Sequence, residues 1–210
     1  LDLLRERGFD PIVTGDPSDP DEHRLRIHDG VQRPDRLLVE LGVGVRHVTL
    51  PNGRACRFLF VNWLQMQDPH AVFSAEARPL PDQQHPGLGL FIHFSYLLKL
   101  IADRIGCDGL MNHPSHPHNG VLYGKVCQFV DPAIEGRFRA LERDIGTEDL
   151  VQLSLELDQG RIVDAEGQPY AWEPAPQVLP VSKAARSWFR SETYREQVEQ
   201  ELERVHYQRV

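Results

Sequence analysis

Residues 55–64 of this 210-residue chain read Ala-Cys-Arg-Phe-Leu-Phe-Val-Asn-Trp-Leu, and the middle of the stretch is almost continuously apolar. A run of this kind is typical of a strand that is buried on both faces. Two shorter apolar segments precede it at residues 37–41 and 45–50, and an Asn52-Gly53 turn joins the second segment to the buried run. We therefore predict an antiparallel meander over residues 36–66 that ends in the central strand of a sheet.

Downstream of this strand the hydrophobic period changes from that of a strand to that of a helix. Apolar side chains recur at helical spacing from Leu90 to Ile105, and Gly106 follows at a position that favours a helix cap. The next elements predicted are a strand, a helix and a strand, at residues 107–112, 117–126 and 127–130. We predict an α/β fold with a mixed central sheet, in which the antiparallel meander is followed by a β-α-β-α-β half.

The two ends of the chain are predicted as additions to an α/β domain formed by residues 36–146. Residues 1–35 are loop-rich, because Asp and Pro favour turns and offer little apolar surface, and residues 10–30 are predicted to be a surface loop. Residues 147–210 are predicted to be an extension of helices and a hairpin. Its last helix, after Ser182, carries an apolar stripe too sparse for a core helix, so we predict that it docks either on its own domain or on a second copy, with a homodimer as the favoured arrangement.

The chain is acidic, with 31 Asp and Glu against 23 Lys and Arg and a net charge of −8. Nucleic acids and anionic membrane surfaces attract clustered Lys and Arg, so we expect neither as a partner. No apolar run approaches the roughly 20 residues that a membrane-spanning helix needs. The three cysteines (Cys56, Cys107 and Cys127) show no C-x-x-C spacing and fit a reducing compartment. The composition predicts a globular, cytoplasmic protein.

Six residues between the central strand and the long helix give the strongest functional signal: Gln84-His85-Pro86-Gly87-Leu88-Gly89. Glycine lets backbone N–H groups approach a ligand closely, and a helix N-terminus adds unpaired N–H groups and the positive end of the helix dipole. Together these features favour a phosphate or a pyrophosphate. The same glycines would also suit a tight turn that merely enters a helix, so the residues alone leave both interpretations open.

The spacing Gln84-x-x-Gly87-x-Gly89 resembles the Q/R-x-x-G-x-G/A element of the acyl-CoA N-acyltransferase superfamily, the GNAT fold. In that family the element follows the central strand and opens the helix that carries the pyrophosphate of coenzyme A. The segment Leu122-Tyr123 and the residues after it resemble the end of the family's next helix, where a tyrosine lies near the thiol. The resemblance covers roughly residues 36–131.

The resemblance implies a protein that binds coenzyme A or an acyl-CoA as cosubstrate and transfers the acyl group to the amine of a small molecule or peptide. It implies that Tyr123 is the catalytic residue, acting as a general acid. The cofactor-binding residues that it implies are Gln84, Gly87, Leu88, Gly89, Leu90 and Asn119. Acyl transfer also needs a deprotonated amine. Asp68, Glu76 and the histidines of the loop are candidate bases, and their spacing singles out none.

Two alternatives stay open. The run from His113 through His116 to His118 is dense in imidazole, a common zinc ligand, and a metal-dependent hydrolase would use these three side chains. No H-E-x-x-H pattern completes a metal site, so no metal is expected. The second alternative is a non-catalytic binding or assembly protein on an acyltransferase-like frame, because the loop carries no basic residue beside Gly87 and Gly89.

Overall fold

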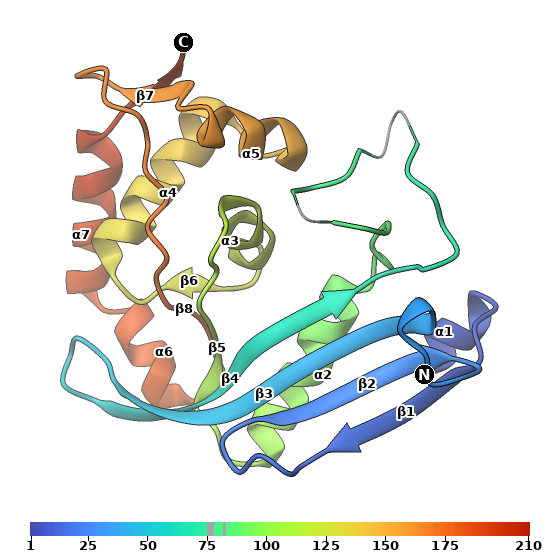
Figure 1. The fold of residues 1–210 in the computed structure, drawn as a ribbon. Coiled ribbons are helices and arrows are strands. Elements are labelled where there is room, and N and C mark those ends of the chain that lie inside the picture. Colours follow the sequence, from blue (N-terminus) through green and yellow to red (C-terminus); the bar gives the residue numbers. More distant parts are fainter. Residues whose placement is uncertain (75–77, 82) are drawn as a thin grey trace.

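A computed structural model describes residues 1–74, 78–81 and 83–210 and shows an α/β fold around a mixed seven-stranded sheet (Figure 1). The strands, in their spatial order, are β1 (Pro11–Asp16), β2 (His23–Asp29), β3 (Leu37–Thr49), β4 (Ala55–Met66), β5 (Gly109–Asn112), β8 (Gln177–Pro180) and β6 (Gln128–Phe129). Strands β4 and β5 pair in parallel, and the other neighbours in this sheet are antiparallel. The predicted α/β class and mixed central sheet are confirmed.

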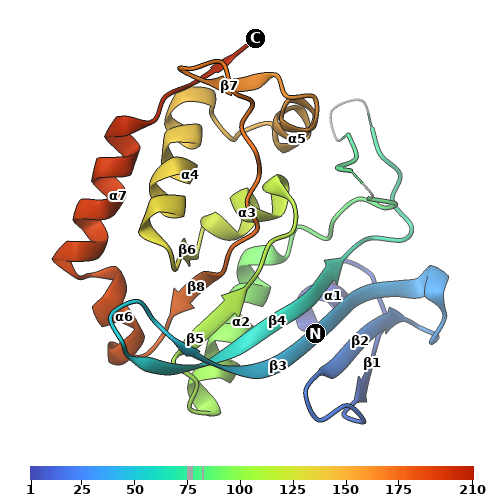
Figure 2. The same ribbon diagram turned by 60° about the vertical axis from the view of Figure 1, so that its left-hand side comes forward.

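Helices lie on both sides of this sheet, and a second, two-stranded sheet lies near the C-terminus. The helical elements are α1 (Asp2–Glu6), the 3-10 turn η1 (Pro34–Arg36), α2 (Phe91–Arg104), α3 (Pro117–Gly124), α4 (Pro132–Ile145), α5 (Leu150–Asp158), α6 (Lys183–Phe189) and α7 (Glu192–Arg204). The second sheet pairs β7 (Ile162–Asp164) with β9 (Tyr207–Arg209). Figure 2 shows α4, α6 and α7 grouped at the side of the molecule away from β1 and β2. Among the described residues, no helix is both long enough and apolar enough to cross a membrane.

The central strand β4 is buried on both faces, as its apolar run predicts. Phe58 lies in a core with side chains of β5, β8, α6 and α7. The next residue, Leu59, lies in a different core with Leu110 of β5 and Leu98 of α2. Successive side chains of a strand point to opposite faces, so one continuous apolar run supplies both cores.

The prediction that residues 10–30 form a surface loop is wrong. Strands β1 and β2 occupy most of this stretch and pair with each other, and β2 also pairs with β3. Leu25 and Ile27 pack against the sheet's apolar face, while Arg24 and Arg26 alternate with them and form ion pairs on the other face. This period-two pattern outweighs the turn composition, which applies only to residues 17–22 between the strands.

The long helix predicted after Ser182 is two helices, α6 and α7, and both pack on their own chain. Trp188 and Val198 are buried in the core beneath the sheet. Tyr194, which the predicted stripe omits, is buried beside them, and its hydroxyl donates a hydrogen bond to the carbonyl of Phe129 at 2.7 Å. The prediction that this stripe is too sparse for a core helix is therefore wrong, and the predicted docking of the stripe on a second copy is replaced by packing within the chain.

The region predicted as a C-terminal extension also contributes to the main sheet. Strand β8 lies between β5 and β6 and is antiparallel to both. The side chain of Gln177, fully buried in β8, donates a hydrogen bond to the carbonyl of Gly120 in α3 at 3.1 Å. Residues after 146 therefore help to hold strand β5 and helix α3 in place.

Helix α7 packs so closely on α4 at Gly136 that a larger residue there should destabilise the protein. A Cβ atom there would stand 2.6 Å from Cβ of Glu201 and 2.7 Å from the carbonyl oxygen of Val198. We expect Gly136→Ala to lower the free energy of unfolding by about 1–3 kcal/mol through overpacking, although helix propensity alone favours Ala by about 1 kcal/mol. Urea unfolding measures the change.

Ser187→Ala, at an exposed position of α6, is the control and should change stability by no more than about 0.5 kcal/mol. A Gly136→Ala variant more stable than the parent would contradict the close approach of α7 to α4.

Candidate functional site

A cleft lies where the parallel strands β4 and β5 part. The two strands pair only at residues 58–60 and 109–111. Beyond this point β4 continues alongside β3 to Met66, while the chain after Asn112 leads into α3. In α/β sheets ligands favour a crevice at the carboxyl ends of strands. The cavity at this place has a volume of about 440 Å³.

Four segments line the cleft: the end of β4, the loop before α2 with the first residue of α2, helix α3, and the start of α5. The structure brings six of the predicted residues to it: Gln84, Gly87, Leu88, Gly89, Asn119 and Tyr123. Leu90 is different, since its side chain is buried on the other side of the loop with Leu4 and Val39. Residues from four separate parts of the sequence therefore share one cavity.

Two helices begin at this cleft without a side-chain cap. Leu90 precedes α2 and His116 precedes α3, and neither side chain accepts a hydrogen bond from the helix that it precedes. In contrast, an Asp or Ser side chain caps each of α4, α5, α6 and α7. The first N–H groups of a helix have no partner within the helix. Two positive helix ends therefore meet at the cleft and favour an anion there.

A guanidinium group lies beside the glycine loop. Nη1 of Arg7 donates a hydrogen bond to the carbonyl of Leu88, and it lies 4.0 Å from the position that a Cβ atom at Gly89 would take. The local sequence around these glycines contains no Lys or Arg. Arg7 is 81 residues away from Leu88 along the chain. No local signal could have found this contact, which depends on how α1 folds back on the sheet.

Tyr123 lies in the cleft wall opposite the start of α2. Its ring centroid is 5.5 Å from that of Phe91, with a tilt of 33° between the ring planes. Burial raises the pKa of Tyr123 above its ordinary value, and the neighbouring thiol of Cys127 raises it further. The phenol is therefore protonated at neutral pH, which is the state that a general acid needs.

A smaller cavity, of about 30 Å³, extends the cleft between β4, β5, α2 and α3, and it shares Leu64, Phe91 and Tyr123 with the cleft. Asn112 lines it, and Nδ2 of this side chain donates to Sγ of Cys127 at 3.8 Å. Oδ1 of Asn112 is buried and has no hydrogen-bond partner among the described residues. Buried polar atoms without a partner are rare, and a cavity of this size has room for about one water molecule, which could donate a hydrogen bond to Oδ1 of Asn112.

The candidate bases separate into those inside the cleft and those outside it. Asp68 does not line the cleft, and its carboxylate accepts hydrogen bonds from the amides of His70 and Ala71 within its own turn. Glu76 lies outside the described residues. Two histidines line the cleft: His85 from the loop, and His118, whose Nδ1 lies 3.4 Å from Oγ of Ser154.

The predicted histidine cluster does not converge on one point. His113 and His116 are exposed while His118 is buried, and the rings of His116 and His118 stack with their centroids 5.4 Å apart. The described part of the chain contains no group of three or more His, Cys, Asp or Glu residues placed to hold a metal ion. The metal-dependent hydrolase therefore has no ligand set among the residues described.

Sequence reasoning missed the contribution of β4 to the cleft. Trp63 and Gln65 of β4 and Gln67 just after the strand line it, and Trp63 is about half exposed (51%). A signal was present, because polar or amphipathic side chains alternate at the carboxyl end of an otherwise apolar strand. Such alternation indicates that one face of the strand leaves the core there.

Comparison with known proteins adds no relative: no family model matches the chain, and no curated protein or solved structure matches it significantly. The inference about function therefore depends on the cleft itself and on the resemblance of its loop and tyrosine to the acyl-CoA N-acyltransferase motifs.

The reactivity of the three cysteine thiols tests whether their buried surroundings, including the small cavity beside Cys127, stay closed in solution. All three thiols are buried, and burial raises their pKa values, that of Cys127 to about 12. Because the thiolate is the reactive form, we expect native protein at pH 8 to react negligibly with Ellman's reagent. In guanidinium chloride three thiols should react at the rate of free cysteine. One thiol that reacts rapidly in the native state would show that the small cavity opens in solution.

Proposed function

We propose that this chain binds acyl-coenzyme A in the cleft between β4 and α3 and transfers the acyl group to a primary amine of a small molecule or peptide. The observation that carries the proposal is the position of the Gln84–Gly89 loop and Tyr123. Sequence resemblance relates both to coenzyme A, and they line one cavity although 34 residues or more separate them.

The pyrophosphate is proposed to bind at the glycine loop and the uncapped start of α2. Gly87 and Gly89 allow a ligand close to the backbone, and the first amides of α2 lack partners within the helix. Arg7 adds a positive charge beside the same loop. A helix N-terminus together with a guanidinium suits a doubly charged ligand better than a neutral one.

The arm of the cosubstrate would then extend along the carboxyl end of β4 toward Tyr123. This arm contains amide groups, and Oδ1 of Asn112 is a buried acceptor in the small cavity that adjoins the cleft. Gln65 of β4 and Gln67, which follows the strand, provide further amides at the cleft. A cleft of about 440 Å³ lies within the ordinary range for small-ligand sites, roughly 300–1,000 Å³.

The proposed reaction needs two proton transfers. The nitrogen of a neutral amine attacks the thioester carbonyl and forms a C–N bond, and the C–S bond then breaks. The leaving thiolate takes a proton from Tyr123, whose raised pKa keeps it protonated until that step. His85 or His118, the histidines of the cleft, would accept the proton that the amine nitrogen loses.

A non-catalytic binding protein is the second candidate function, and one observation favours it. The described residues that line the cleft include no lysine or arginine, so the cationic contribution comes only from helix ends and from Arg7 beside the loop. Such a protein would bind coenzyme A or a related anion without turnover. Binding and turnover therefore have to be measured separately.

Binding is tested by thermal unfolding with coenzyme A. A ligand that binds only the folded state at 100 times its dissociation constant adds about 2.7 kcal/mol, which raises the melting temperature of a chain of this size by several degrees. Pantetheine, which lacks the pyrophosphate, should give a smaller shift because it makes no contact with the start of α2. No shift with millimolar coenzyme A would contradict the acyltransferase, and it would leave the second candidate only as a binder of another anion.

Gly87→Val should abolish that shift. The backbone at Gly87 tolerates a side chain, since φ is not positive and an added Cβ would lie 3.7 Å or more from its neighbours. The new side chain would instead occupy the space next to the ligand. Gly15→Val, on edge strand β1 where a Cβ meets nothing within 4 Å, is the matched control and should keep the full shift.

Turnover is tested with Tyr123→Phe. Removal of a general acid typically costs 10²–10⁴-fold in rate, so we expect the release of coenzyme A from acetyl-CoA, in the presence of a panel of primary amines, to fall by about 100-fold or more. The thermal shift with coenzyme A should persist. Tyr207→Phe, on β9 outside the cleft, is the control. Equal rates for Tyr123→Phe and the parent would exclude the acid role, and no turnover in the parent would favour the non-catalytic candidate.

A further inference from the structure

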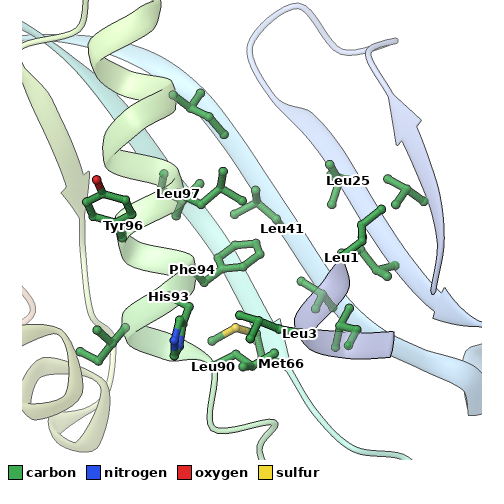
Figure 3. Close-up of a pocket in the computed structure, with 17 residues that line it drawn as sticks. Leu1, Leu3, Leu25, Leu41, Met66, Leu90, His93, Phe94, Tyr96 and Leu97 are labelled. Atoms are coloured by element: carbon green, nitrogen blue, oxygen red, sulfur yellow. The ribbon is translucent and has the colours of Figure 1, made fainter. Parts of the chain in front are cut away.

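An apolar groove runs between α2 and the strands β2 and β3, on the side of α2 away from the cleft. It has a volume of about 770 Å³ (Figure 3). Leu1 and Leu3 line one wall of the groove, and Phe94 and Leu97 of α2 line the other. Among the described residues that line it, only His93 and Tyr96 carry polar side-chain atoms.

The apolar surface is longer than the groove, because it continues along the outer face of α2. Two rows at helical spacing point outward, Ile92-Tyr96-Leu100 and Leu97-Ile101-Ile105. Between residues 92 and 101 the exposed positions of α2 carry no Asp, Glu, Lys or Arg, the half-buried Lys99 places Nζ 5.9 Å from the Tyr96 ring centroid, and the exposed charges Asp103 and Arg104 come at the C-terminal end of the helix. A helix that faces water normally places charged side chains on that side, so this face of α2 has the composition of a contact surface.

We infer that this face binds the same face of a second copy of the chain in a two-fold symmetric dimer. The exposed apolar side chains are Leu1, Leu3, Val13, Ile92, Tyr96, Leu97, Leu100, Ile101 and Ile105. From their exposed fractions, which lie between 39% and 60%, they present on the order of 800 Å², the share that one partner contributes to an interface of standard size.

The pattern on α2 suits a self-complementary contact. In an antiparallel pair of helices, Ile92 of one copy stands against Ile105 of the other. Tyr96, Leu97, Leu100 and Ile101 of both copies, all apolar or aromatic, form the middle of the contact, while the exposed charges Asp103 and Arg104 lie near its two ends. The two rows follow the i, i+4 ridges whose interdigitation is the commonest mode of helix packing in globular proteins. A two-fold axis therefore covers the face with one patch used twice.

A small apolar ligand fits the observations less well. Small-ligand sites usually contain several placed polar groups, and this groove offers two polar side chains. Leu100 and Ile105 also lie outside the groove, so a ligand that filled it would leave part of the apolar row in water. The dimer covers the row along its whole length. This dimer is distinct from the one predicted through the C-terminal helix, which packs within its own chain.

The test is the mass of the full chain in solution, measured by sedimentation equilibrium for the parent, for Leu97→Glu and for Leu155→Glu. We expect a dimer for the parent and a dissociation constant raised by roughly 100-fold or more for Leu97→Glu, the scale of an interface hot spot. Leu155 is exposed to a similar degree on α5, so Leu155→Glu should stay dimeric. A monomeric parent, with or without a copurified lipid, overturns the inference, and so does a Leu97→Glu variant that dimerises as strongly as the parent.

Cross-linking tests the geometry with a single cysteine placed in the apolar face. The three native thiols are buried and should not react with the cross-linker. Leu100→Cys therefore adds one reactive thiol near the proposed two-fold axis. A short bismaleimide should join two Leu100→Cys chains efficiently and two Val72→Cys chains poorly, since Val72 is 87% exposed in the loop after β4. Equal cross-linking of both variants overturns the proposed contact face.

Discussion

The burial of β4 on both faces is the constraint on which the rest of this structure depends. An apolar strand with cores on both sides has to be covered twice, and α2 covers one face while α6 and α7 cover the other. Hydrophobic burial of this kind is the main favourable contribution to folding. The two covering layers come from distant parts of the sequence, so the central strand can be buried only when the whole chain closes around it.

The same constraint produces the cleft. Strand β5 is only four residues long and pairs with β4 at its start, so the carboxyl half of β4 has β3 on one side and no strand partner from β5 on the other. The glycine loop, α2 and α3 surround this opening, and two uncapped helix ends and an unpaired amide oxygen lie in its walls. Polar groups left unsatisfied by a well-packed fold are features that a ligand can satisfy.

Several residues at the cleft and in the cores owe their positions to long-range packing. Arg7 reaches the glycine loop because α1 packs with Leu88 and Leu90. Gln177 of β8 anchors α3, the helix that carries Tyr123. On α2, only one side of the apolar stripe is covered within the chain: Leu98 is buried, whereas Leu97 and Ile101 face outward. The helical period predicts both sets as apolar and contains no information on which neighbour covers each one.

The sequence by itself determined the elements whose signals are local. The continuous run of β4, the helical period of α2 and the glycine loop before α2 follow from hydrophobic period and glycine. These signals depend on neighbours within a few residues. Only the tertiary structure decided that residues 10–30 join the sheet, that α6 and α7 pack inward, and that the loop, Tyr123, His85 and His118 share one cavity. Those outcomes depend on contacts between residues far apart in the chain, because burial is decided by whichever distant surface completes a core.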